Sequence, residues 1–262
     1  MTVKSPTDTI KTALEIGASK ASVTSTNSGR LITLSILAGA YIALGGVLSL
    51  IIGYGFPGIS ATNPGMQKLL SGCVFPVGLI LVVVLGAELF TGNNALLVPA
   101  FMAKRCSMWV VLKNWTIVYL GNFLGAIVLT RILVYDCGLT AAEPYHSSII
   151  GIAQAKVSMP WLTVFLKGVG ANWCVCLGVW LALSGHNLVE KMLGCWFPVM
   201  TFVALGFEHS IANMFFIPLG MMEGADVTAW QAIANNLIPA TLGNIVGGAL
   251  LVGAVHTRLH LK

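Results

Sequence analysis

The sequence predicts an all-α integral membrane protein with six transmembrane helices. Of the 262 residues, 56% are hydrophobic and only 9% are charged, and the mean hydropathy is +0.87. A soluble domain carries roughly 25% charged residues, so lipid must be the solvent for most of this surface. This composition excludes a soluble enzyme, a nucleic-acid binder and a disordered chain.

Six apolar stretches follow one another, separated by short polar links. They cover approximately residues 31–53, 69–103, 107–135, 158–184, 192–222 and 231–255. A membrane-spanning helix needs about 20 apolar residues, so six crossings use most of the chain. Residues 1–262 are therefore expected to form a single transmembrane domain without a sizeable extramembrane part.

The charged residues in the links indicate how the chain is oriented. Most of the cations lie on one side: Lys4, Lys11, Lys20, Arg30, Lys104, Arg105, Lys113, Lys191, Arg258 and Lys262. The other side has Lys68, Arg131 and Lys156, together with four acidic residues. By the positive-inside rule, both termini lie in the cytoplasm and the chain is a multi-pass protein of the inner or plasma membrane. Termini on one side require an even number of crossings, in agreement with six.

The first 30 residues are polar and have a character of their own. Ser5 can cap a helix that has Pro6 in its first turn and Asp8 near its N-terminus. One face of this helix would carry Ile10, Ala13, Leu14 and Gly17. The pattern is typical of an amphipathic helix lying on the cytoplasmic membrane surface, although a solvated helix would look similar.

The second and fifth apolar stretches do not fit simple helices. Both are long, and they contain Glu88 and the pair Glu208 and His209. A carboxylate at mid-membrane costs about 3 kcal/mol, but it is tolerated where a helix breaks and frees backbone N–H groups. We therefore expect two discontinuous helices, broken near residues 88–93 and 208–213. Their support would come from side chains that bind the freed backbone: Glu88, Asn93, Glu208 and Asn213.

The two broken stretches belong to an internal repeat. Residues 72–77 (GCVFPV) resemble 194–199 (GCWFPV), and residues 85–88 (LGAE) resemble 205–208 (LGFE). The next stretches match through Asn114 with residues 121–126 and Asn236 with residues 243–248. Residues 31–135 and 158–258 are thus two copies of a three-span unit, and the second copy must be inverted because three is odd. Inverted repeats with paired broken helices indicate a transport path near the midplane; a packing-only duplication would not explain a glutamate in both apolar centres.

Several motifs resemble the formate/nitrite transporter family. They are residues 206–214 (GFEHSIANM), 88–92 (ELFTG), 172–177 (NWCVCL) and 235–239 (NNLIP). The resemblance implies an aquaporin-like arrangement of six spans, a homopentamer with one pore per protomer, and passage of small monovalent anions of weak acids. Residues 207–220 and 235–253 look most like formate channels, whereas residues 88–92 and 165–168 look closer to nitrite channels. Formate is the first expectation; nitrite, hydrosulfide, lactate and acetate stay open.

His209 is the only histidine inside an apolar stretch. The resemblance implies that it meets the anion and shares or donates a proton, for which an imidazole with a pKa near 6.5 is suited. A satisfied core histidine is the alternative. Thr91 lies at the matching break, where its hydroxyl can bond the histidine or the anion, or else cap the second half-helix.

Three further residues are candidates for the anion pathway. Asn172 can donate to an anion from the fourth span, or form a hydrogen bond between helices. Lys156 matches a vestibule lysine of formate channels and can raise the local anion concentration, although a plain loop charge is an alternative. Lys167 lies deeper in the fourth span and either snorkels or attracts anions. The other lysines and arginines, which contribute to the net charge of +5, are expected to set the topology.

Six apolar residues match positions that narrow the pore in this family, although the residues alone indicate only packing. They are Phe75, Leu79, Leu89, Phe90, Val175 and Phe202. An apolar constriction excludes a hydrated ion because the ion would lose its water. It favours the neutral acid, or an anion paired with a proton from His209.

Nothing in the sequence calls for a metal or a cofactor. The six cysteines have no zinc-like spacing, and the pair Cys174 and Cys176 is a weak signal. A haem site in a helix bundle would need facing histidines, and His209 stands alone. We therefore expect no enzyme activity; the expected partners are a small anion, the lipid bilayer and further copies of the chain.

Overall fold

The computed structural model describes residues 3–261, and within them every regular element is a helix. The first half contains α1 (Pro6–Thr26), α2 (Ser28–Tyr54), α3 (Pro57–Thr62), α4 (Pro64–Val74), α5 (Val77–Leu85), α6 (Phe90–Met102), α7 (Met108–Leu129) and the π-helical segment η1 (Thr130–Tyr135). The second half contains α8 (Tyr145–Ser158), α9 (Trp161–Ser184), α10 (Leu188–Ala204), α11 (Ser210–Met222), α12 (Ala229–Gln231), η2 (Ala232–Leu237), α13 (Ile238–Ile245), η3 (Val246–Ala254) and α14 (Val255–His260).

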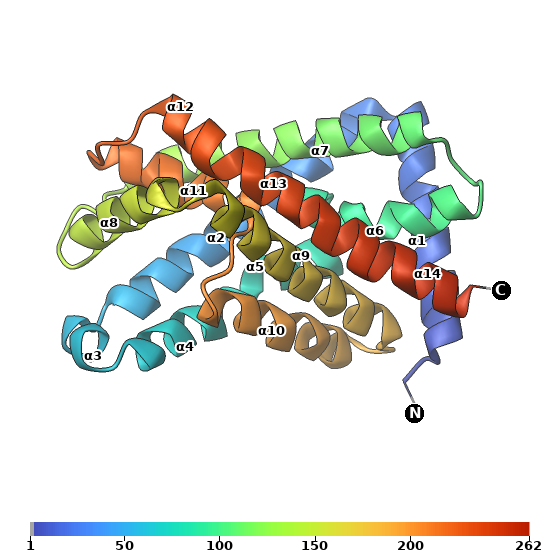
Figure 1. Ribbon diagram of the computed structural model, residues 1–262, viewed down its shortest axis with the longest axis horizontal. Coiled ribbons are helices and arrows are strands. Elements are labelled where there is room, and N and C mark those ends of the chain that lie inside the picture. The colour runs from blue at the N-terminus through green and yellow to red at the C-terminus, as the bar shows by residue number, and fades with distance from the viewer. Residues whose placement is uncertain (1–2, 262) are drawn as a thin grey trace.

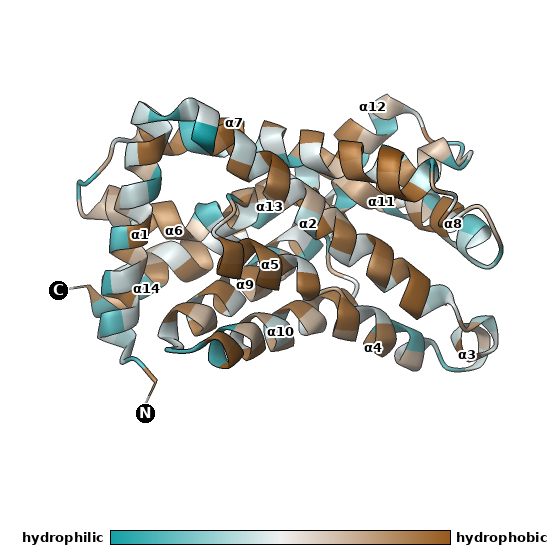
Figure 2. Cartoon of the chain, turned by 180° about the vertical axis from the view of Figure 1, so that it is seen from behind, coloured by the Kyte–Doolittle hydropathy of each residue, from teal (hydrophilic) through white to brown (hydrophobic). Residues whose placement is uncertain are grey.

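These helices form six crossings. Within residues 3–261, five stretches are long and apolar enough to span a membrane: Ser28–Tyr54, Pro64–Leu85, Met108–Tyr135, Trp161–Ser184 and Ala229–His260. The shorter helices α10 and α11 together make the remaining crossing, as the stretch Pro64–Leu85 followed by α6 does in the first repeat. Figure 2 shows hydrophobic residues along the long helices and hydrophilic residues gathered at the two ends of the molecule. This is the distribution expected of a multi-pass membrane protein.

The beginning and the end of the chain lie at one end of the molecule. Figure 1 shows α1 and α14 at this end, with α3, α8 and α12 at the opposite end. The arrangement agrees with an even number of crossings.

The two predicted helix breaks are present. Helix α5 ends at Gly86, which has a φ of +71°, and α10 ends just before Gly206, which has a φ of +67°. A left-handed glycine is a common way to end a helix because it lacks a Cβ atom. The chain then runs extended through Leu89 and His209 before α6 and α11 begin. The breaks therefore cover residues 86–89 and 205–209, slightly earlier than predicted, and Asn93 and Asn213 lie in the first turn of the following helix.

In each repeat, the first and the third span pack against each other through a glycine. A Cβ atom on Gly125 of α7 would lie 1.9 Å from the carbonyl oxygen of Ile36 on α2. In the second repeat, a Cβ atom on Gly247 would lie 2.3 Å from the carbonyl oxygen of Val169 on α9. Only glycine permits this approach, which is typical of helices packed within membranes. The pairing of α2 with α7 and of α9 with η3 supports the inverted repeat.

Helix α1 packs on the protein rather than on lipid, which corrects the prediction for the amphipathic segment. Its start is as predicted, because the Ser5 side chain accepts a hydrogen bond from the Asp8 amide and Pro6 opens the helix. Its apolar face, including Ile10 and Ala13, is buried. Gly17 lies so close to α6 that a Cβ atom would be 2.2 Å from the Leu96 carbonyl oxygen. Small residues on this face let α1 dock against α6.

Candidate functional site

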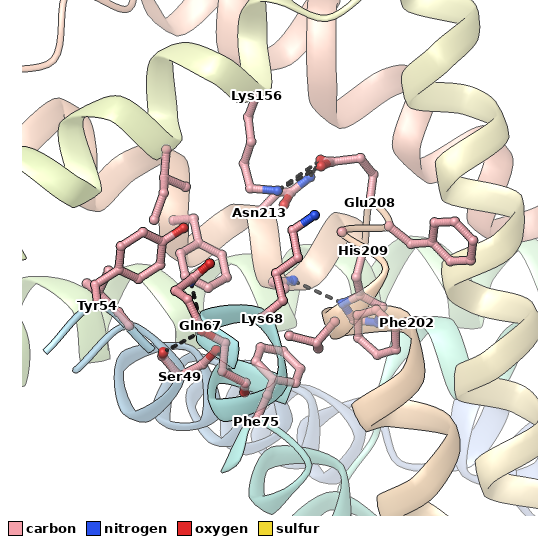
Figure 3. A pocket seen from close by; sticks show the side chains of 18 residues that line it. Ser49, Tyr54, Gln67, Lys68, Phe75, Lys156, Phe202, Glu208, His209 and Asn213 are labelled. Atoms are coloured by element: carbon pink, nitrogen blue, oxygen red, sulfur yellow. Dashed lines mark hydrogen bonds and ion pairs between the residues drawn. The ribbon is translucent and has the colours of Figure 1, made fainter. Parts of the chain in front are cut away.

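Two pockets enter the protein from its opposite ends. The first, here the Lys156 pocket, lies among α2, α4, α8, α10 and α11 and is lined by Lys68, Phe75, Lys156, Phe202, Glu208 and His209 among others (Figure 3). The second, here the Lys20 pocket, lies among α1, α5, α6 and α9, and its lining includes Lys20, Leu79, Leu89 and Asn93. Each has a volume of about 190 Å³. This is room for several water molecules, so an anion can stay hydrated in either pocket.

The pockets end at equivalent positions of the two repeats. His209 lines the Lys156 pocket and Leu89 lines the Lys20 pocket. Each residue directly follows the glutamate of its repeat, and both are buried. No described residue of these two linings is shared, so protein separates the pockets.

A hydrogen bond between the repeats lies at this separation. The Nε2 atom of His209 is 2.9 Å from the Thr91 hydroxyl oxygen, and both residues are buried. The Nδ1 atom of His209 accepts a hydrogen bond from the Ala212 amide at 3.1 Å. Because Nδ1 accepts, the neutral ring carries its hydrogen on Nε2, and this hydrogen is donated to Thr91. Of the alternatives for Thr91, the structure shows the bond to histidine; its side chain does not cap α6.

Glu208 is held by an ion pair and by asparagine amides. The Lys156 ammonium lies 2.9 and 3.1 Å from the two carboxylate oxygens. Asn213 and Asn236 donate to the same carboxylate at 2.7 and 3.1 Å. The side chain of Glu208 is 4% exposed and that of Lys156 is 16% exposed. The buried charge is therefore paired and hydrogen-bonded, as burial requires.

Glu88 has the same surroundings in the first repeat. Lys20 of α1 binds its carboxylate at 2.8 Å, and Asn93 donates to it at 2.7 Å. Asn114 accepts a hydrogen bond from Asn93 and donates one to Thr24 of α1. Helix α1 thus provides the lysine that pairs with the glutamate of the first repeat, as α8 does for the second repeat. The sequence did not reveal this correspondence.

The freed backbone is bound by other residues than predicted. The amide of Phe90 donates to the Asn122 side chain at 2.9 Å, and the amide of Ser210 donates to Asn244 at 2.8 Å. Asn122 and Asn244 in turn donate to the Glu88 and Glu208 carbonyl oxygens. The expectation that the Glu88, Glu208, Asn93 and Asn213 side chains bind these groups is wrong, because the two carboxylates accept from lysine ammonium groups and asparagine amides instead.

Asn172 and Lys167 lie outside both pockets. The side-chain nitrogen of Asn172 donates to the Thr91 and Asn244 carbonyl oxygens, at 3.2 and 2.6 Å, and to the Asn94 side chain. Of the two alternatives for Asn172, the structure shows the bond between helices, which fixes the backbone of Thr91. The Lys167 ammonium lies 3.6 Å from the Met159 sulfur.

The six predicted constriction residues divide into three groups. Phe75 and Phe202 meet edge to face, with ring centroids 5.8 Å apart, and the Phe202 ring stacks on His209 at 5.7 Å. Leu79 and Leu89 are buried at the Lys20 pocket. Val175 is buried on α9, and the ring of Phe90 packs on Trp115 and Tyr119 of α7. The last two residues line neither pocket, so four apolar side chains remain at the inner ends of the pockets.

Two pocket residues were not singled out by the sequence. Lys20 was assigned to topology, and its position after the apolar face of α1 gave no sign of a buried partner. Lys68 was also assigned to topology, although it stands four residues before Gly72, at the start of the repeated motif. That spacing places Lys68 one helical turn before the motif, and this was the one sequence feature that could have marked Lys68 as a pocket residue.

Comparison with known proteins decides the family. The family model described as "Formate/nitrite transporter" matches residues 7–258. The chain belongs to the formate/nitrite transporter family. A probable formate transporter of Methanothermobacter thermautotrophicus is 42% identical, with 99% of this chain and 98% of that protein covered.

Solved structures of the family share the fold. A structure described as an FNT family ion channel has a TM-score of 0.87 and 31% sequence identity, covering 97% of this chain and 99% of its own. A pentameric formate channel with formate bound has a TM-score of 0.77 and 34% identity, covering 90% and 98% of the two chains. The resemblance seen in the sequence is therefore confirmed over nearly the whole chain.

Proposed function

We propose that this protein is a homopentameric membrane channel for formate and related monovalent anions of weak acids, with one pathway through each protomer. The pathway runs from the Lys156 pocket past His209 and Thr91 to the Lys20 pocket. The observation that carries the proposal is the 2.9 Å hydrogen bond between these two residues, located between two pockets whose linings include buried apolar side chains. Relatives named for formate transport and a formate-bound pentamer support it.

The apolar inner ends of the pockets favour a neutral permeant. Moving a bare carboxylate into an apolar medium costs tens of kcal/mol by Born solvation in the limit of complete dehydration. The side chains of Phe75, Phe202, Leu79 and Leu89 are apolar and at most 3% exposed, so they offer a passing anion no replacement for its water. Formate therefore crosses this segment together with a proton, as formic acid.

His209 has a defined part in this crossing. While Nδ1 accepts from the Ala212 amide, the ring has one hydrogen, on Nε2, and donates it in a hydrogen bond without releasing it. The acid carbonyl oxygen can accept this bond, and the acid hydroxyl can donate to Thr91. The pair replaces part of the lost hydration, and the proton travels with the permeant rather than coming from histidine.

The remaining features of the proposal concern assembly and orientation. The end of the molecule that carries α1 and α14 holds most of the link cations, so it faces the cytoplasm by the positive-inside rule. The Lys156 pocket then opens outward and the Lys20 pocket opens inward. The helix faces exposed in one protomer, with residues such as Leu120, Leu124 and Leu166, are available for lipid or neighbouring protomers.

The experiment is efflux from proteoliposomes loaded with formate, nitrite, hydrosulfide or lactate, scanned from about pH 5 to pH 8, the range in which an ordinary histidine titrates. Formate efflux well above that of protein-free liposomes is expected. Faster efflux of another of these anions would show that this anion is the preferred substrate, and the proposed channel function would still hold. No efflux of any of them would contradict the proposal.

A further inference from the structure

The charges of the Lys156 pocket are unequally balanced. Its lining contains three formally charged side chains: Lys68, Lys156 and Glu208. Lys156 and Glu208 neutralise each other through two contacts of 2.9 and 3.1 Å. An anion entering the pocket therefore meets a closed ion pair on one wall, and Lys156 offers it little net charge.

Lys68 stands apart from this pair. It lies in the second turn of α4, and within residues 3–261 it forms no ion pair and no hydrogen bond through its side chain. Its side chain is exposed, and Figure 3 shows it extending into the pocket. Helix α4 is fixed at its start by Asn63, whose side chain accepts from the Met66 amide at 3.2 Å. The ammonium is thus an uncompensated charge on a well-defined helix.

The second repeat shows that this charge is not part of the shared architecture. Four residues before the matched Gly194, the position equivalent to Lys68 holds Glu190. Its carboxylate accepts from the His186 amide at 2.6 Å and from the Asn187 side chain at 2.8 Å. Glu190 lines neither pocket. The paired lysine and glutamate occur in both repeats, whereas an unpaired pocket lysine on this helix occurs only in the first.

We propose that Lys68 is the residue that collects the anion in the Lys156 pocket and sets its occupancy there. The inference rests on the proposed function and adds to it a docking charge distinct from Lys156. An uncompensated ammonium at a few ångströms raises the local concentration of a monovalent anion, and the effect is largest at low ionic strength. The anion waits beside Lys68 until it takes up a proton and moves past Phe75 and Phe202.

The occupancy of the Lys156 pocket by the anion and the barrier to crossing at His209 can be measured separately, so the proposal can be tested. Removing a charge beside a waiting site weakens binding there, while the crossing at His209 is unchanged. Lys68→Gln should therefore raise the half-saturating formate concentration by about three- to tenfold at low salt. The maximal flux should change by less than about twofold. Lys68→Arg should resemble the wild type because it retains the charge.

The measurement uses right-side-out and inverted membrane vesicles from cells that have no other formate transport. The increase is expected only when formate is added on the face with the Lys156 pocket, and it should disappear at about 1 M salt, where the Debye length is about 3 Å. Arg131→Gln is the matched control, because Arg131 is a cation of the same face that lies outside the pocket and pairs with Asp136.

The outcomes separate this inference from the proposed function. If the wild type carries formate and Lys68→Gln has the wild-type half-saturating concentration at low salt, the assignment of Lys68 is wrong and the channel function stands. If Arg131→Gln shows the same increase as Lys68→Gln, a general surface charge is responsible and the assignment is also wrong. If the wild type carries no formate, the proposed function itself fails.

Discussion

The Nε2 atom of His209 and the hydroxyl of Thr91 are 2.9 Å apart, and they come from the broken helices of two different repeats. Their positions are not equivalent under the repeat: His209 corresponds to Leu89, and Thr91 corresponds to Ile211. One polar pair therefore interrupts an otherwise apolar centre. The asymmetry places a hydrogen-bond donor and acceptor where neither repeat alone would provide both.

Removal of the Thr91 hydroxyl tests this pair. Thr91→Val keeps the shape of the side chain but leaves the Nε2 hydrogen of His209 without its acceptor. We expect formate flux to fall about tenfold, because one hydrogen bond to the permeant is lost, whereas Thr91→Ser should keep most of the flux. Ser210→Ala serves as the control, since the Ser210 hydroxyl is buried without a hydrogen-bond partner. Equal fluxes for the valine and serine variants would show that the hydroxyl has no part in permeation.

The ion pair of Lys156 and Glu208 should contribute to stability only as a pair. Lys156→Met leaves the buried carboxylate uncompensated, and removal of one partner of a buried pair typically costs about 3–5 kcal/mol. The double variant Lys156→Met with Glu208→Gln removes both charges and keeps an acceptor for Asn213. We expect its thermal midpoint in detergent to lie between that of Lys156→Met and the wild type. A double variant less stable than Lys156→Met would contradict this account.

Substitution of Asn122 or Asn244, which bind the backbone at the helix breaks, should lower the stability more than substitution of an exposed polar residue. Asn122→Leu deprives the Phe90 amide and the Glu88 carbonyl of their partners, and each buried unsatisfied group costs about 1–3 kcal/mol. Asn244→Leu should behave alike, because its bonds to Ser210 and Glu208 are equivalent. Thr201→Val is the comparison, since the exposed Thr201 hydroxyl bonds only within its own helix. The free energy of unfolding in detergent checks the difference, and similar losses for all three variants would refute it.

Glycine packing gives a prediction that does not involve the pore. Gly125→Ala would place a methyl group 1.9 Å from the Ile36 carbonyl oxygen, so α2 and α7 must separate at a cost of about 1–3 kcal/mol. Gly151 of α8 has nothing within 4 Å of the position of its Cβ atom. Gly151→Ala should be neutral or stabilise the helix by up to about 1 kcal/mol. Thermal unfolding of the two variants decides, and a Gly125→Ala protein as stable as Gly151→Ala would be inconsistent with the packing.

The sequence predicted the helix breaks and the repeat because each has a local signal. A glutamate in an apolar stretch is costly enough to require an explanation, and Gly86 and Gly206 provide the left-handed turns that end the helices. His209 was identified because a histidine inside an apolar stretch is conspicuous. These features can be found without knowing how the helices pack.

The partners of these residues depend on packing and could not be predicted. Nothing local shows that Lys20 of α1 reaches Glu88, which is 68 positions later, or that Asn122 rather than Glu88 binds the freed backbone. Lys156 was noticed and Lys68 was not, because only the three-dimensional arrangement shows which ammonium already has a carboxylate. The family resemblance predicted that Phe90 narrows the pore. In the structure its ring points to α7 and packs on Trp115 and Tyr119.

The central claim is that formate passes the His209 and Thr91 pair as the neutral acid. Its most direct test is the simultaneous recording of formate efflux and internal pH in proteoliposomes whose membrane potential is clamped. The account predicts equal numbers of protons and formate ions leaving together, at a rate that does not respond to the potential. Formate efflux that follows the potential and leaves the internal pH unchanged would contradict it.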